Sequence, residues 1–140
     1  MTSCAQLTHE HALPALRILL VEDQLEMRRL LVSVLQADGH VVVEASDGLQ
    51  ALTPLLGRPG DPEIDLVVTD VRMPRCTGLD LLAFVRLERP LMPVVLITGF
   101  GDAPTHAEAR RLGATAIFDK PFDLYAFRDT VRGLLHRPGG

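Results

Sequence analysis

The sequence has 140 residues, of which 47% are hydrophobic, and this suits one compact domain with a substantial core. Its net charge of −4 and its lack of a basic block disfavour nucleic-acid binding by the chain alone, and no apolar run approaches the ~20 residues of a membrane span. Cys4 and Cys76 fit neither a disulfide framework nor a metal-binding spacing, so with no signal-peptide pattern we expect a cytoplasmic protein in a reducing compartment.

The predicted elements begin with an aliphatic strand over 17–21 and a helix over 24–38. A second strand over 41–45 precedes a helix that Asp47 caps and that Pro54 should kink or shorten. Apolar residues recur at helical spacing in the first helix. Its inward face should carry Met27, Leu30, Leu31, Val34 and Leu35.

An exposed loop over 57–62 leads to a third strand over 65–70. The unbroken aliphatic run of this strand is typical of a strand covered on both faces, and it stops abruptly at an acid. A third helix over 78–89 follows, and then a fourth buried strand over 94–98. The third helix should turn inward Leu81, Leu82, Val85 and Leu87.

The last part of the chain begins with a predicted helix over 102–112. Its apolar residues are mainly alanines, so we expect it to be the least firmly packed helix. A fifth strand over 114–118 leads into a last amphipathic helix, which runs from Leu124 to about His136. The apolar face of this helix should carry Leu124, Phe127, Val131, Leu134 and Leu135.

Five strands that alternate with five helices predict a doubly wound α/β fold with a parallel sheet. One domain over 17–136 accounts for all of these elements, between a flexible N-terminal tail over 1–16 and a C-terminal tail over 137–140. Ligands of such sheets bind outside the carboxyl ends of the strands. A functional site is therefore expected at that edge.

Polar side chains stand where four of the predicted strands end. Glu22 and Asp23 end the first strand, Asp70 ends the third and Thr98 the fourth, and Lys120, the only lysine of the chain, follows the fifth. A single residue of this kind is more often a turn former or a helix cap. Their convergence on one edge of one sheet favours a site with chemistry of its own.

Three carboxylates at one edge repel one another, by about 4 kcal/mol for a pair about 4 Å apart at an effective dielectric constant of about 20. Either a carboxyl pKa rises or a cation enters. Hard oxygen ligands suit Mg²⁺, and neither His nor Cys is placed to favour zinc. A carboxylate beside Mg²⁺ and a lysine can attack phosphorus and form an acyl phosphate, to which Thr98 could donate a hydrogen bond.

Several segments resemble the receiver domain of two-component response regulators, the CheY-like family. The resemblance covers about residues 17 to 136 and implies the flavodoxin-like strand order 2-1-3-4-5. It is carried by Leu19-Leu20-Val21-Glu22-Asp23, by Asp70-Val71-Arg72-Met73-Pro74 with Gly78, by Ile97-Thr98-Gly99, and by Gly113-Ala114 through Lys120-Pro121-Phe122.

The resemblance implies that Asp70 is the phosphoacceptor, which takes phosphate from a sensor histidine kinase or a histidine phosphotransfer protein. Lys120 would pair with Asp70 and then with the phosphoryl group, and the Lys120-Pro121 bond would be cis. Thr98 would follow the phosphoryl group and couple it to a surface that binds a downstream protein target. The implied protein is a single-domain response regulator, not an enzyme.

The resemblance also implies a Mg²⁺ site in the same acidic cluster. Asp23 would bind the metal directly, Glu22 largely through water, and Asp70 would share it. The backbone carbonyl of Arg72 would complete the protein ligands. Glu22 stands where Asp is common in the family, a mild change that should preserve metal binding.

One departure from the family keeps a second reading open. Ile117 stands where the family usually has an aromatic residue whose rotamer follows the switch. A phosphorylation-independent, receiver-like adaptor is therefore the alternative. A phosphatase of the haloacid dehalogenase type is disfavoured, because Arg72 stands where that chemistry needs a second Asp.

The surface formed by the last two helices also has two interpretations. It is either a weak homodimer contact, as receivers often make, or a solvated surface, and the second is favoured. The polar residues concerned are Arg110, Arg111, Asp119 and Arg128.

Overall fold

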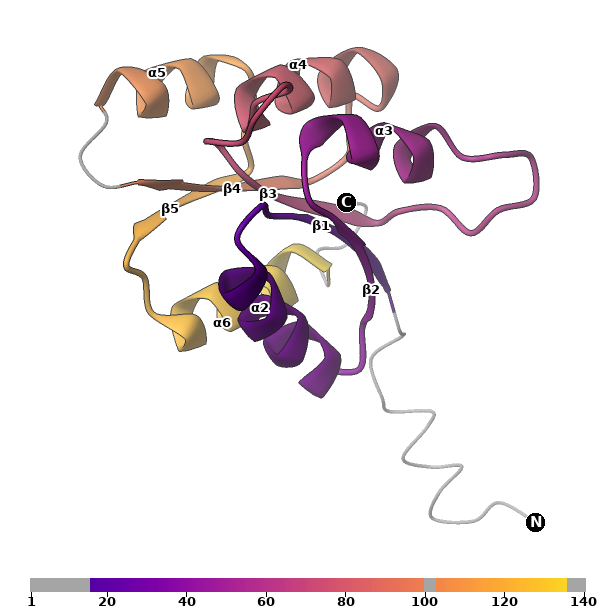
Figure 1. Cartoon of the computed structure of the whole chain (residues 1–140), viewed down its shortest axis with the longest axis horizontal. Helices are drawn as coiled ribbons and strands as arrows, with labels where there is room; N and C mark the ends of the chain where they lie inside the picture. The colour runs from indigo at the N-terminus through magenta and orange to yellow at the C-terminus, as the bar shows by residue number, and fades with distance from the viewer. Residues whose placement is uncertain (1–15, 100–102, 136–140) are drawn as a thin grey trace.

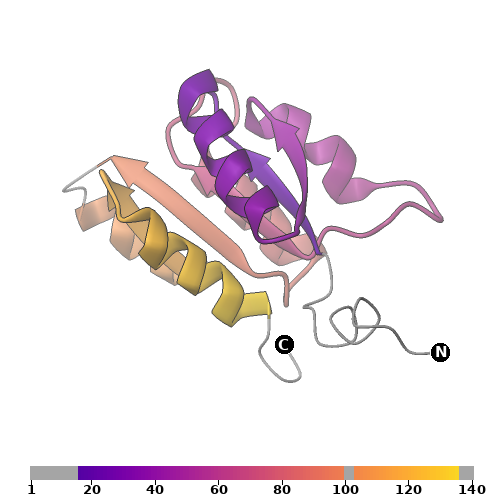
Figure 2. The same ribbon diagram turned by 90° about the horizontal axis from the view of Figure 1, so that it is seen from below.

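A computed structural model describes residues 16–99 and 103–135, and in it a five-stranded sheet lies between two layers of helices (Figure 1). One layer contains α3, α4 and α5, and the other contains α2 and α6; Figure 2 shows the second layer from its own side. The strands are β1 (Arg17–Val21), β2 (Val41–Ala45), β3 (Leu66–Asp70), β4 (Val94–Gly99) and β5 (Ala116–Lys120). The helices are α2 (Leu25–Ala37), α3 (Gly48–Leu56), α4 (Gly78–Glu88), α5 (Ala103–Arg111) and α6 (Leu124–Leu135).

The sheet has the strand order β2-β1-β3-β4-β5, and every neighbouring pair is parallel. This confirms the doubly wound α/β fold and the order 2-1-3-4-5. All five residues of β3 are buried, as are four of the five in β1, because helices cover both faces of the central strands. The predicted tails over 1–16 and 137–140 lie outside the described residues, except for residue 16.

The strand β5 begins later than the predicted range 114–118, and that prediction was wrong. Gly113, at φ 88°, ends α5, and the backbone N–H of Ala114 donates to the carbonyl of Ala109. Residue 114 therefore completes the helix terminus. Strand pairing begins at Ala116, opposite Val95, and it continues through Lys120, so that the lysine is the last residue of the strand.

Two leucines expected to face inward are exposed instead. Leu30 of α2 is 44% exposed and Leu87 of α4 is 83% exposed. Each lies at the margin of the apolar face of its helix. In α2 the centre of that face is formed by Leu31 and Leu35, which are buried. The other predicted boundaries agree with the structure to within one residue, and Asp102, the predicted start of α5, lies outside the described residues.

The core divides into two clusters, one on each face of the sheet. The α2 and α6 side includes the fully buried Phe127, whereas α5 contributes a single buried residue, Ala109. This agrees with the light anchoring expected for that helix. Asp47 caps α3 as predicted, and this helix continues through Pro54 to end at Leu56. No helix in the described ranges is long and apolar enough to span a membrane.

Candidate functional site

Three acids from two neighbouring strands meet at the carboxyl edge of the sheet. Glu22 and Asp23 follow β1, and Asp70 is the last residue of β3. Each offers a carboxylate oxygen, and these three oxygens lie within 4.8 Å of one another. Glu22 and Asp70 are buried, whereas Asp23 is exposed, so the cluster opens to solvent on the Asp23 side.

Lys120 brings a cation to this cluster from the end of β5. Its Nζ donates to Asp70 Oδ2 at 2.7 Å and lies 3.5 Å from Glu22 Oε1. Burial alone lowers the pKa of Lys120, but the hydrogen bond to Asp70 and the charges of Asp70 and Glu22 together raise this pKa above its ordinary value. The ammonium thus contacts two of the three acids, and it is charged at neutral pH.

The backbone around Asp70 positions its carboxylate. Asp70 Oδ1 accepts a hydrogen bond from the Arg72 N–H at 3.1 Å. The Val71 N–H donates to the carbonyl of Ile97, and the Gly78 N–H donates to the carbonyl of Val71. The second bond closes the loop after β3 at its base. Gly78 has no room for a side chain, because a Cβ there would lie 2.2 Å from the Asp70 carbonyl oxygen.

Glu22 is held by contacts that the sequence pattern did not reveal. Its Oε2 accepts from the Gln24 N–H at 3.1 Å, and the Arg28 guanidinium donates to its backbone carbonyl at 2.8 Å. Arg28 lies on the second turn of α2, and nothing in its spacing marked this role. Burial raises the pKa of Glu22 to about 7, and the nearby charge of Asp70 adds to the increase.

The raised pKa of Glu22 predicts a specific pH dependence of stability in the metal-free protein. Between its ordinary pKa of 4.5 and about 7, the native state holds a proton that the unfolded chain has lost. Stability should therefore fall as pH rises through this window. Glu22→Gln removes this titration, so its melting temperature should rise relative to wild type between about pH 5 and about pH 8. Circular dichroism melts with a chelator present test this, and a constant difference would contradict it.

The contacts of Thr98 and Arg72, two other predicted site residues, involve backbone groups. Thr98 is buried near the end of β4, and its Oγ1 donates to the carbonyl of Gly99 at 3.0 Å. Arg72 contacts Asp70 through its backbone N–H, while its own side chain is exposed. The roles of the Thr98 hydroxyl and the Arg72 carbonyl stay predictions. The Lys120-Pro121 bond is cis, as expected.

The two residues before Asp119 in β5 face opposite layers. Ile117 packs with the cluster formed under α3, α4 and α5. Phe118 lies on the other side, where its ring centroid is 5.6 Å from that of Phe122 and 5.7 Å from that of Phe127. Phe118 therefore does not supply an aromatic ring on the side where Ile117 lies.

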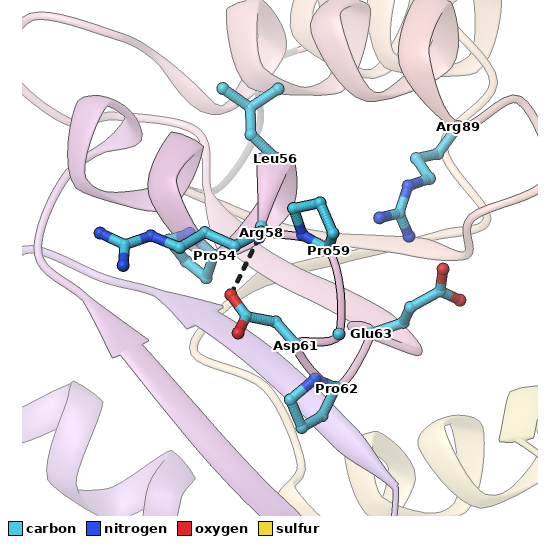
Figure 3. A pocket seen from close by; sticks show the side chains of 10 residues that line it. Pro54, Leu56, Arg58, Pro59, Asp61, Pro62, Glu63 and Arg89 are labelled. Carbon is cyan, nitrogen blue, oxygen red and sulfur yellow. Dashed lines mark hydrogen bonds between the residues drawn. The ribbon is translucent and has the colours of Figure 1, made fainter.

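A separate pocket of about 310 Å³ lies on the side of the amino ends of the strands, between the end of α3 and the start of β3. Figure 3 shows its loop, in which the Arg58 N–H donates to Asp61 Oδ2 at 2.9 Å. The acidic cluster is at the carboxyl ends of the strands, so the two features are distinct. The labelled lining residues are Pro54, Leu56, Arg58, Pro59, Asp61, Pro62, Glu63 and Arg89.

A family model described as the response regulator receiver domain matches residues 18–132. Among curated relatives, sporulation initiation phosphotransferase F of Bacillus subtilis is 34% identical over 120 residues, 85% of this chain and 93% of that protein. The response regulator protein FleR of Pseudomonas aeruginosa is 38% identical over 117 residues. This match includes 84% of the present chain but only 24% of FleR, so the chain corresponds to a part of that protein.

Solved structures share the fold. A response regulator receiver domain protein from Clostridium thermocellum superimposes with a TM-score of 0.79 at 27% identity, over 87% of this chain and 95% of that one. The non-phosphorylated HemR receiver domain from Leptospira biflexa gives a TM-score of 0.77 at 31% identity, over 89% of this chain and 99% of that one.

Proposed function

Because this chain belongs to the family of response regulator receiver domains, we propose that it accepts a phosphoryl group on the carboxylate of Asp70. The observation that carries the proposal is the placement of this buried carboxylate, 2.7 Å from the ammonium of Lys120 and within a cluster of acids. A carboxylate so placed can act as a nucleophile whose product is stabilised by the neighbouring cation.

In the proposed reaction, a carboxylate oxygen of Asp70 forms a bond to phosphorus. The bond from phosphorus to the donor breaks, and the donor atom, a histidine nitrogen in a phosphorylated kinase, keeps the electron pair. Lys120 remains beside the group and offsets negative charge on the phosphoryl oxygens. The Arg72 N–H, 3.1 Å from Asp70 Oδ1, restrains the position of the carboxylate.

The donor set of the cluster fits Mg²⁺. Three carboxylates face one ammonium, which leaves negative charge uncompensated, and the exposed Asp23 gives an ion access from solvent. Asp23 and Asp70 would hold the ion, together with Glu22, largely through water, and with the backbone carbonyl of Arg72. When bound, the ion would neutralise charge on the transferred phosphoryl oxygens.

Metal removal provides the first test of this proposal. Incubation with acetyl phosphate and Mg²⁺ should add the mass of one phosphoryl group to the intact protein, with acetate as the leaving group. The same incubation with a chelator should leave the mass unchanged, because the carboxylates would repel the incoming phosphate. The adduct should be labile in base, as an acyl phosphate is. No gain in wild type, with metal binding established by calorimetry, would instead favour a phosphorylation-independent adaptor.

For the biological donor, we propose a sensor histidine kinase or a histidine phosphotransfer protein, in the cytoplasm. The output would be binding of a downstream protein or transfer of the phosphoryl group to the next carrier. The relay has particular support in a relative named as a phosphotransferase, which this chain covers almost in full. A radiolabelled transfer assay with a purified histidine phosphotransfer protein distinguishes the two outputs.

A further inference from the structure

The loop that connects β3 to α4 contains a backbone conformation that side chains rarely adopt. Arg75 has a φ of 71°, and it is the one non-glycine residue of the described ranges with a positive φ. Residues with a Cβ are strained there unless the surrounding structure holds them. Asn and Gly adopt this conformation at lower cost, so an arginine at this position needs a compensating contact.

That contact is an ion pair with Asp47, the N-cap residue of α3. The Arg75 guanidinium donates to Asp47 Oδ2 at 2.5 Å. The Asp47 side chain is only 3% exposed, and its other oxygen caps α3 by accepting from the Gln50 N–H at 2.8 Å. The Gln50 hydrogen bond first, and then Arg75, lower the pKa of Asp47, so this carboxylate is charged at neutral pH.

A second contact holds the same loop against the same helix. Gly48 begins α3, and a Cβ on it would lie 2.6 Å from Cys76 Sγ. The backbone and side chain of Cys76 therefore lie so close to α3 that only glycine fits at position 48. The two contacts come from adjacent residues, so they fix both the position and the direction of the loop at this point.

This loop also carries the backbone that orients Asp70. It leaves β3 at Asp70, passes through Arg72, whose N–H donates to Asp70 Oδ1, and returns at Gly78. We propose that Arg75 is a positioning residue, which ties the loop to α3 through Asp47 and so holds the Arg72 backbone in place for metal binding and phosphoryl transfer. The inference rests on the proposed function of Asp70.

An ordinary surface ion pair would contribute little, since exposed pairs are worth at most about 1 kcal/mol. The Arg75 pair differs because its acidic partner is buried, already bonded to a helix terminus, and opposite a strained backbone. Arg111 offers a matched control: its side chain is 68% exposed, against 65% for Arg75, and it pairs with Glu108 within α5.

The test compares Arg75→Ala, Arg75→Lys and Arg111→Ala with wild type. We expect Arg75→Ala to weaken Mg²⁺ binding, measured by calorimetry, and to slow phosphorylation by acetyl phosphate, each by about threefold to tenfold. Arg75→Lys should recover to within about twofold of wild type, because it restores a cation opposite Asp47. Arg111→Ala should match wild type in both measurements. A role in stability alone would change the melting temperature of Arg75→Ala and leave both measurements unchanged.

A double-mutant cycle tests whether Arg75 acts through Asp47. Asp47→Asn keeps a good helix cap but removes the charge, and the double variant should be no worse than Arg75→Ala alone. Effects that multiply would overturn the inference. An unchanged Mg²⁺ affinity and an unchanged phosphorylation rate in Arg75→Ala, with wild type active, would also overturn the inference. The proposed function of Asp70 would still stand in that case. A wild-type chain that neither binds Mg²⁺ nor gains a phosphoryl group would overturn both.

Discussion

Asp70→Asn is expected to abolish the gain of one phosphoryl group from acetyl phosphate. The amide of asparagine is a far weaker nucleophile than a carboxylate, and it cannot form an acyl phosphate by simple attack on phosphorus. The variant should nevertheless fold, because asparagine has nearly the same shape and its oxygen can still accept from the Arg72 N–H or from Lys120. Intact mass with Mg²⁺ present measures the effect directly.

The control for this variant is Asp129→Asn, which makes the same change at an exposed position of α6. It should be phosphorylated as fully as wild type. A mass gain that persists in Asp70→Asn would contradict the assignment. The exposed Asp23, in the same cluster, would be the next acceptor to examine by peptide mapping.

Gly78→Ala is expected to reduce the free energy of unfolding by about 3 kcal/mol. An added Cβ would lie 2.2 Å from the carbonyl oxygen of Asp70 and 2.8 Å from the Cα of Val71. Both are backbone atoms next to a strand that is buried on both faces, so they cannot move aside without disturbing the sheet. Urea unfolding followed by circular dichroism measures the loss, and phosphorylation should fall with it because Asp70 is displaced.

Gly133→Ala is the matched control for this change. Gly133 lies within α6, and an added Cβ there meets nothing within 4 Å. Alanine should stabilise the protein at this position, by up to about 1 kcal/mol, because it restricts the unfolded chain and favours the helix. Equal unfolding curves for the two variants would show that the short distance between position 78 and the Asp70 carbonyl does not reduce the free energy of unfolding when a Cβ is added.

The alternation of elements was predictable because it depends on strong, repeated patterns, whereas the order of the strands came from the family resemblance. The aliphatic runs of β1 and β3 are buried on both faces, and such runs are visible in one dimension. The start of β5 was not predictable, since the hydrogen bond from Ala114 to Ala109 decides it. Leu87 is apolar and at helical spacing, but only the finished packing shows that no partner covers it.

The acidic cluster was predictable for a different reason. In a parallel sheet the carboxyl ends of all strands share one edge, so Glu22, Asp70 and Lys120 were expected at the same edge. Lys120 reaches Asp70 across β4, which lies between β3 and β5. The contacts that hold Glu22 and the loop after β3 in place follow no such rule. The bonds from Arg28 to Glu22 and from Arg75 to Asp47 join elements through loops whose paths only three-dimensional structure reveals.

The ring cluster of Phe118, Phe122 and Phe127 gives the molecule a mechanical asymmetry. Three aromatic rings, with centroids 5.6 to 5.7 Å apart, fasten β5 to α6 on one side of the sheet. On the other side, α5 contributes one buried residue, Ala109, and contacts β5 through the hydrogen bond between His106 and Asp119. We therefore expect a displacement at the end of β5 to move α5 more readily than α6, which packs on the sheet through large buried side chains.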